Sequence, residues 1–121
     1  MTTAMLKVYT LANCDTCRRA TKWLRANRVA FEEFAIRETP PTPAELRAML
    51  AAQDGKLVRL FNTAGRDYRE HGLGEKLPDL KPEEALALLA ANGNLVKRPF
   101  AIGKGVGLVG FDEAGWRAAL V

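Results

Sequence analysis

The sequence is poor in the residues that build metal clusters and disulfide scaffolds. Its 121 residues contain two cysteines and one histidine, whereas a structural zinc site needs four ligands and small disulfide-stapled domains need several cysteine pairs. No apolar run approaches the roughly 18–20 residues of a membrane span, and the N-terminus lacks the pattern of a signal peptide. We therefore expect a cytoplasmic protein that is stabilised by an ordinary hydrophobic core.

Length and charge place modest limits on the protein. A chain of 121 residues predicts a single domain over residues 1–121, of which we expect the first four to be frayed. The net charge of +4 is mild. The segment between Thr16 and Phe31 contains basic residues but no acidic one. This pattern is typical either of a solvated helix face or of an anion-attracting surface beside the cysteines. The basic residues of the segment are Arg18, Arg19, Lys22, Arg25 and Arg28.

Both cysteines lie in one C-x-x-C motif, at Cys14 and Cys17, between an apolar segment and a basic one. We expect a strand over 5–11 and a helix over about 14–27. The free amides and the positive end of such a helix favour a thiolate at its start. Cys14 is then the predicted nucleophile, and Cys17, one turn further on, the resolving thiol. Two alternatives remain, namely a zinc site shared with a partner chain and a pair of inert core cysteines.

The pattern after this helix predicts one further strand and then a long helical stretch. Residues 29–36 read as a strand, so the first three elements form a βαβ unit with two parallel strands. The stretch 42–93 predicts an insert of helices. Its first helix begins at Thr42, with a capping-box pattern, and its last begins at Pro82.

Within the insert, residues 57–61 and residues 67–73 predict two shorter helices. The end of the chain then returns to strand. A hairpin with a glycine turn is expected within 100–111, and Asp112 should cap a closing helix. The expected order is βαβ, helical insert, β-hairpin and helix. It predicts an α/β, thioredoxin-like fold with a mixed four-stranded sheet.

Four blocks of the sequence resemble the arsenate reductase/Spx (ArsC-like) family, in order and at the spacing of that family. The block Phe61–Thr63 is similar to an uncharacterised Spx/MgsR-like branch of it. The resemblance carries implications for both activity and site residues. The four matching blocks are Tyr9–Ala20, Leu60–Gly65, Lys97–Pro99 and Leu108–Phe111.

The resemblance implies a role for each of several residues. Cys14 is the reactive thiol of the family, Arg98 brings a guanidinium to it, and Pro99 is similar to the cis-proline of thioredoxin-like proteins. From the sequence alone, Arg98 could equally be a surface arginine at a strand edge. The predicted catalytic residues are Cys14, Cys17 and Arg98, and the predicted substrate-binding residues are Asn13, Arg18, Asn62 and Pro99.

The predicted function rests on this resemblance and on the positions where this chain departs from the family pattern. Members that reduce arsenate are similar but carry three arginines around the cysteine. Two of those positions fall on Asn62 and near Gly110, which leaves Arg98, although Arg18 or Arg66 could compensate. We therefore expect a monomeric thiol–disulfide oxidoreductase rather than an arsenate reductase. It would be reduced by thioredoxin, glutaredoxin or glutathione, with no metal, nucleotide or nucleic acid.

The Spx branch implies an alternative function for the same disulfide. Proteins of that branch use the C-x-x-C motif as a switch and bind the C-terminal domain of the RNA polymerase α subunit. This chain has Gly55 in the region where Spx presents a glycine to the polymerase. Gly55 could instead simply end a helix, so the sequence leaves both the enzyme and the redox-switched regulator open.

Overall fold

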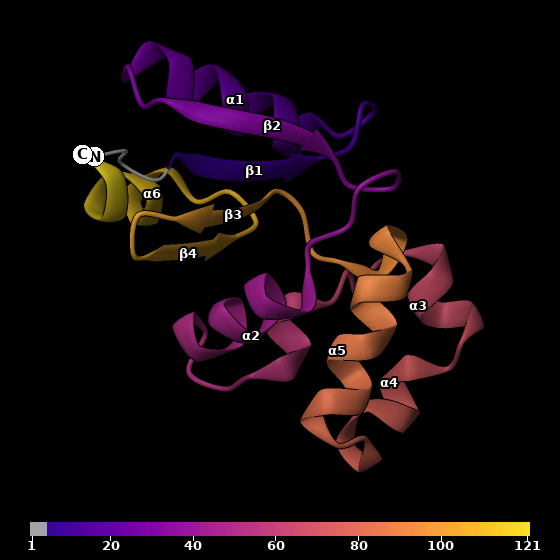
Figure 1. Cartoon of the computed structure of the whole chain (residues 1–121). Coiled ribbons are helices and arrows are strands. Elements are labelled where there is room, and N and C mark those ends of the chain that lie inside the picture. The colour runs from indigo at the N-terminus through magenta and orange to yellow at the C-terminus, as the bar shows by residue number, and fades with distance from the viewer. Residues whose placement is uncertain (1–4) are drawn as a thin grey trace.

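A mixed four-stranded sheet organises the chain. The computed structural model describes residues 5–121; residues 1–4, for which we expected fraying, lie outside the described residues. The strands lie in the order β2-β1-β3-β4, with helices on both faces (Figure 1). This is the α/β, thioredoxin-like architecture that the order of elements predicted. Within the described residues, no helix is long and apolar enough to cross a membrane.

The N-terminal half of the sheet is a βαβ unit. Its elements are β1 (Leu6–Thr10), α1 (Asp15–Ala26) and β2 (Phe31–Ala35). The two strands pair in parallel, from Leu6 opposite Phe31 to Thr10 opposite Ala35, which confirms the prediction. Parallel pairing requires a crossover between the strands, and α1 supplies it, with its first turn following the carboxyl end of β1.

The C-terminal half is an antiparallel hairpin followed by a helix. β3 (Phe100–Gly103) pairs with both β1 and β4 (Val106–Val109). The closing helix α6 (Glu113–Leu120) begins as predicted, because the Asp112 carboxylate accepts a hydrogen bond from the Gly115 amide at 3.0 Å.

A helical insert connects the two halves of the sheet. Thr42 and Pro82 begin its first and last α-helices as expected, and Thr42 and Glu45 form a reciprocal capping box. The predicted single helix over 67–73 was wrong: two helices occupy that region, because Gly72 adopts a left-handed φ of 62° between them. The elements of the insert are α2 (Pro43–Ala52), η1 (Leu57–Leu60), α3 (Arg66–Glu70), α4 (Leu73–Lys76), η2 (Leu77–Asp79), α5 (Pro82–Ala91) and η3 (Gly93–Leu95), where η denotes a 3₁₀ helix.

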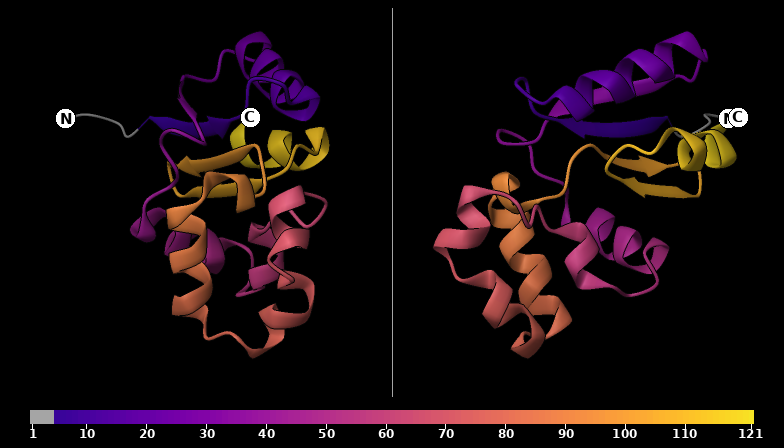
Figure 2. Two further views of the ribbon diagram at one scale, coloured as in Figure 1. Left: turned by 90° about the vertical axis from the view of Figure 1, so that its right-hand side faces the viewer. Right: turned by 180° about the vertical axis from the view of Figure 1, so that it is seen from behind.

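Each face of the sheet has its own hydrophobic core. Leu6 and Val8 of β1 pack against α1 and α6, in a cluster that includes Trp23 and Trp116. Tyr9, the neighbour of Val8, belongs to the opposite cluster, with the insert, as alternation along a strand requires. The views in Figure 2 show α1 and the insert on opposite sides of the sheet.

Two contacts join the helical insert to the segments that leave β2 and enter β3. Phe61 and Val96 form an isolated antiparallel bridge, which is flanked by hydrogen bonds from the Asn62 amide to the Leu95 carbonyl and from the Lys97 amide to the Leu60 carbonyl. Gly93 lies so close to the Ile36 carbonyl that a Cβ at this position would overlap it. The segment after β2 therefore contacts the start of η3, and the segments that follow η1 and η3 pair with each other.

Gly93→Ala should lower the free energy of unfolding by about 2–3 kcal/mol, because a methyl group would force the two backbones apart. Urea denaturation followed by circular dichroism measures the change. Gly74→Ala is the matched control, because its new Cβ would meet Tyr68 only at 3.8 Å within helix α4. We expect this control to leave stability unchanged or to raise it by up to about 1 kcal/mol. Equal destabilisation by both substitutions would contradict the role of the close approach.

Candidate functional site

Cys14 occupies the N-cap of helix α1. Its backbone is extended, with φ −115° and ψ 109°, and its Sγ accepts a hydrogen bond from the Cys17 amide at 3.2 Å. The sulfur thus takes the place that a serine or aspartate oxygen usually has at a helix start. Cys14 is half-buried, so its sulfur combines access with an amide donor and the positive end of the helix dipole.

Cys17 lies one turn further along α1 in a different environment. It is only 2 % exposed and belongs to the face of α1 that packs on the sheet. Burial, and to a smaller extent the adjacent Cys14 sulfur, raise the pKa of the Cys17 thiol to about 12, against the opposing effects of a backbone hydrogen bond at Leu11 and the charge of Arg98. Both cysteines are free thiols in this structure, and their surroundings distinguish an accessible sulfur from a protected one.

Arg98 reaches this region from the segment that enters β3. The Arg98–Pro99 peptide bond is cis, as the resemblance implied, and Pro99 is buried. The Nε atom of Arg98 is buried and has no hydrogen-bond partner within residues 5–121. Arg98 thus places a positive charge that acts on Cys17 and keeps a donor without a protein acceptor among the described residues.

The structure brings some of the other predicted site residues together and separates others. Asn62 lines the same cavity as Arg98. Asn13 is exposed in the turn before Cys14. Arg18 lies apart from this cavity: its guanidinium donates to the Ala12 carbonyl and forms an ion pair with Asp15, and it does not line the cavity of Arg98. Both partners of Arg18 thus lie within six positions of it in the sequence.

The cavity of about 320 Å³ beside Arg98 contains residues that the sequence did not single out as site residues. Arg37 follows β2, and its Nε donates to the Asn94 Oδ1 at 2.6 Å across 57 positions of the sequence. Arg66 begins helix α3. No local pattern could have identified Arg37 or Asn94, because only the folded insert brings them together. The cavity is lined by Arg37, Asn62, Gly65, Arg66, Asp67, Asn94 and Arg98.

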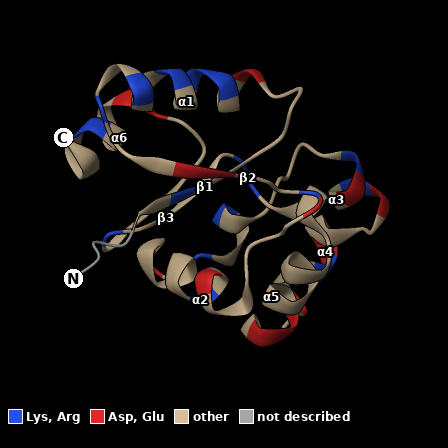
Figure 3. Ribbon diagram, turned by 45° about the horizontal axis from the view of Figure 1, so that its top comes forward, with Lys and Arg blue, Asp and Glu red and all other residues tan. Residues whose placement is uncertain are grey.

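The Lys and Arg positions of α1, which Figure 3 marks in blue along the ribbon, are exposed and form a basic stripe on this helix. Several of them have partners: Arg25 pairs with Glu33 at 3.7 Å, and the Arg19 guanidinium lies 5.9 Å from the centre of the Phe111 ring. Exposed pairs of this kind contribute little to stability. The basic stripe is therefore consistent with a solvated helix face. Compared with it, the cavity of Arg98 is the more enclosed cationic site.

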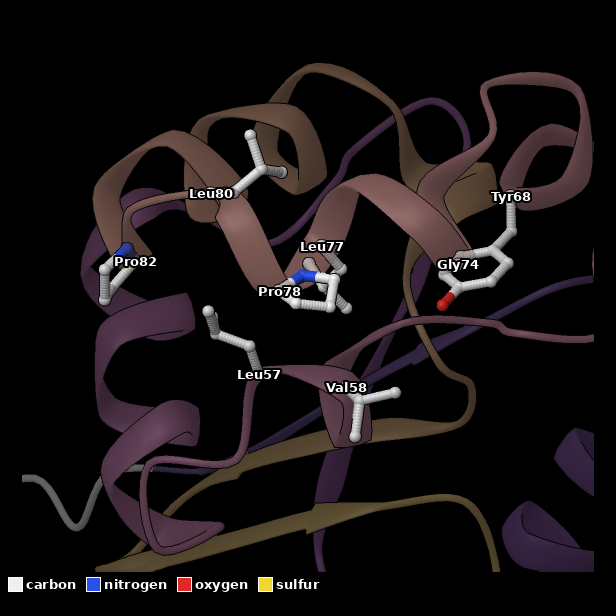
Figure 4. Close-up of a pocket in the computed structure, with 8 residues that line it drawn as sticks. All are labelled: Leu57, Val58, Tyr68, Gly74, Leu77, Pro78, Leu80 and Pro82. Carbon is white, nitrogen blue, oxygen red and sulfur yellow. The ribbon is translucent and has the colours of Figure 1, made fainter.

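A second hollow lies within the helical insert. It has a volume of about 350 Å³, and its walls are almost entirely apolar, with Leu57 and Val58 facing Leu77 and Pro78 (Figure 4). Tyr68 is the one lining residue with a side-chain polar group. No cysteine or arginine lines this hollow, so it contributes no group to thiol chemistry. Within residues 5–121, no three His, Cys, Asp or Glu side chains cluster as metal ligands.

Comparisons with known proteins agree with this architecture. The model of the ArsC family matches residues 9–119. The uncharacterised protein YusI of Bacillus subtilis is 41% identical over 108 residues, which cover 89% of this chain and 92% of YusI. The global transcriptional regulator Spx of Enterococcus faecalis is 30% identical over 109 residues, 90% of this chain and 81% of Spx. A Streptococcus mutans structure described as a possible arsenate reductase superposes with a TM-score of 0.88 at 35% identity, covering 97% of this chain and 99% of that one.

The raised pKa of Cys17 predicts a pH-dependent stability. The thiol form is favoured in the folded state, so its contribution is complete below the unfolded pKa of about 8.5–9 and is lost as pH rises towards 12. Between pH 8.0 and 9.5 the free energy of unfolding should fall by about 1 kcal/mol from this group. Urea denaturation of wild type and Cys17→Ser over this range measures the difference. An identical pH dependence in both proteins would contradict the protected state of Cys17.

Proposed function

Because the chain belongs to the ArsC family, we propose that it is a thiol–disulfide oxidoreductase in which Cys14 is the nucleophile and Cys17 the resolving thiol. The observation that carries this proposal is the asymmetry of the two sulfurs. Cys14 is accessible and accepts an amide hydrogen bond, while Cys17 is buried beside it. One sulfur can meet a substrate, and the other can reach only the first.

The proposed reaction has two displacement steps. The Cys14 thiolate attacks one sulfur of a substrate disulfide, the S–S bond breaks, and the departing thiolate takes a proton from solvent. Cys17 then loses its proton and attacks the Cys14 Sγ, which releases the second substrate thiol and leaves a Cys14–Cys17 disulfide. The substrate gains two electrons, and an external thiol, such as thioredoxin, glutaredoxin or glutathione, restores the dithiol. The steps require neither a metal nor a nucleotide.

The environment of Cys17 suits the second step. While Cys14 carries negative charge, it opposes the ionisation of Cys17. Once Cys14 is bonded to substrate sulfur, that repulsion disappears and the charge of Arg98 remains to favour the Cys17 thiolate. Formation of the mixed disulfide therefore removes one of the effects that raise the pKa of Cys17, while the effect of burial, which is the largest, remains.

The surroundings of Arg98 favour a disulfide over arsenate as substrate. Asn62 and Gly110 stand at the positions where arsenate-reducing members are expected to carry two further arginines. The space over Gly110 holds the Lys97 side chain, whose Cε lies 3.3 Å from the position that a Cβ would take. Without guanidinium groups at these two positions, a multiply charged oxyanion on the Cys14 sulfur would lose donors in its transition state. Arg37 and Arg66 lie in the cavity beside Arg98, which neither cysteine lines. Arg98 and Asn62 would instead bind an anionic part of the disulfide substrate.

The similarity to Spx, a global transcriptional regulator, supports a second candidate, a non-enzymatic redox-switched regulator. The resemblance of the sequence to the Spx branch implies the C-terminal domain of the RNA polymerase α subunit as its partner. Gly55 lies in an exposed turn at φ 75° with open space around its Cα. Its amide also donates to the Leu50 carbonyl at 2.8 Å, so it closes the end of α2 as well. An exposed turn of this kind could contact a partner.

Substitution of each cysteine should separate the two proposed steps. Cys14→Ser should reduce turnover of 2-hydroxyethyl disulfide by a factor on the order of 10³ or more. Cys17→Ser should complete the first step and stall, leaving one mercaptoethanol adduct on Cys14 that intact-mass spectrometry detects. The double variant Cys14→Ser/Cys17→Ser is the control and should acquire no adduct. An adduct on Cys17 in the Cys14→Ser protein, formed as fast as the one on Cys14, would reverse the assignment.

Capture by the purified polymerase α C-terminal domain distinguishes the second candidate. We expect no difference in capture between protein treated with diamide and protein treated with dithiothreitol, while disulfide turnover is retained. Capture in only one redox state, lost in Cys17→Ser and unaccompanied by turnover, would favour the regulator instead.

A further inference from the structure

The cavity beside Arg98 collects three guanidinium groups from three distant segments. Arg37 comes from the exit of β2, Arg66 from the start of α3, and Arg98 from the entry to β3. Two amide side chains, Asn62 and Asn94, and the carboxylate residue Asp67 complete its polar lining. Arg37 and Arg66 are exposed and Arg98 is half-buried, so solvent screens part of the repulsion between these like charges. Internal acids or an external anion would relieve the rest.

Internal acids account for only part of this positive charge. Asp67 is the one carboxylate that lines the cavity, and its Oδ2 accepts a hydrogen bond from Asn92 at 2.9 Å. Within residues 5–121, none of the three arginines forms an ion pair. The cavity therefore has an excess of two positive charges, and the buried Arg98 Nε still lacks an acceptor there.

Specific contacts build this arrangement. The close approach of Gly93 to Ile36 brings the chain at Arg37 against η3, where Arg37 donates to Asn94. Gly65 leaves room for the Asn62 side chain, because a Cβ there would lie 2.5 Å from the Asn62 Nδ2. Gly93 and Gly65 thus allow the chain around the cavity to pack more closely than any residue with a side chain would permit.

We propose that Arg37 and Arg66, together with Arg98, bind the carboxylate of a small acidic disulfide substrate. The inference rests on the proposed function, since Arg98 belongs both to this cavity and to the surroundings of the thiols. Guanidinium groups bind carboxylates through paired hydrogen bonds, and the volume of about 320 Å³ suits part of a small molecule.

Turnover of two matched disulfides tests this specificity. We expect wild type to prefer the disulfide of N-acetylcysteine over that of N-acetylcysteine amide, because only the first carries carboxylates. Arg37→Gln and Arg66→Gln should each lower the ratio of the two kcat/KM values by about tenfold. Arg47→Gln is the matched control, because this exposed arginine of α2 pairs with Glu83 outside the cavity. An unchanged ratio in both cavity variants would overturn the inference.

A binding measurement keeps this inference separate from the proposed reaction. S-methyl-N-acetylcysteine cannot react with a thiol, so it can be titrated into Cys14→Ser while the arginine Nε–H signals are followed by NMR. We expect saturable shifts that Arg37→Gln and Arg66→Gln weaken, and that neither the corresponding amide nor inorganic phosphate reproduces. Such binding, together with an absence of disulfide turnover in the wild-type protein, would refute the proposed function and leave the carboxylate site standing. Equal shifts with the amide, or shifts with phosphate alone, would overturn the site even if turnover is observed.

Discussion

The hydrogen bond from the Cys17 amide to the Cys14 sulfur is the interaction on which the proposed chemistry depends. It makes Cys14 the cap of α1 and fixes its sulfur at the positive end of the helix. The same turn of helix places Cys17 on the buried face. A single local geometry therefore produces two unlike thiols, one accessible and one protected, from two identical side chains.

Distant parts of the chain supply the charges around this pair. The sheet holds β1, which delivers the cysteines, next to β3, which follows Arg98. The bridge between Phe61 and Val96 places Asn62 near the same segment. The helical insert is thus more than a connection between two halves of a sheet, because the segment between η1 and α3 and the 3₁₀ helix η3 carry polar residues that line the cavity of Arg98.

Local patterns in the sequence predicted the elements well, and long-range contacts limited the prediction of the site. The capping box at Thr42 and the cap at Asp112 depend on residues three positions apart, so the sequence displays them directly. The helix over 67–73 was predicted wrongly because Gly72 was not recognised as a break. The pairing of Arg37 with Asn94 spans 57 positions and depends on the backbone approach at Gly93, which no periodicity encodes. Arg18 was placed by its nearness in sequence, whereas its side chain turns back to Ala12 and Asp15.

The rate at which iodoacetamide labels each cysteine in the native protein tests the central asymmetry most directly. Peptide mass spectrometry after timed labelling at pH 7.5 measures both rates, and labelling in guanidinium chloride provides the unfolded reference. The account predicts that Cys14 is labelled at least about ten times faster than Cys17 in the native state, with similar rates once the chain is unfolded. Native rates that are equal, or faster at Cys17, would contradict it.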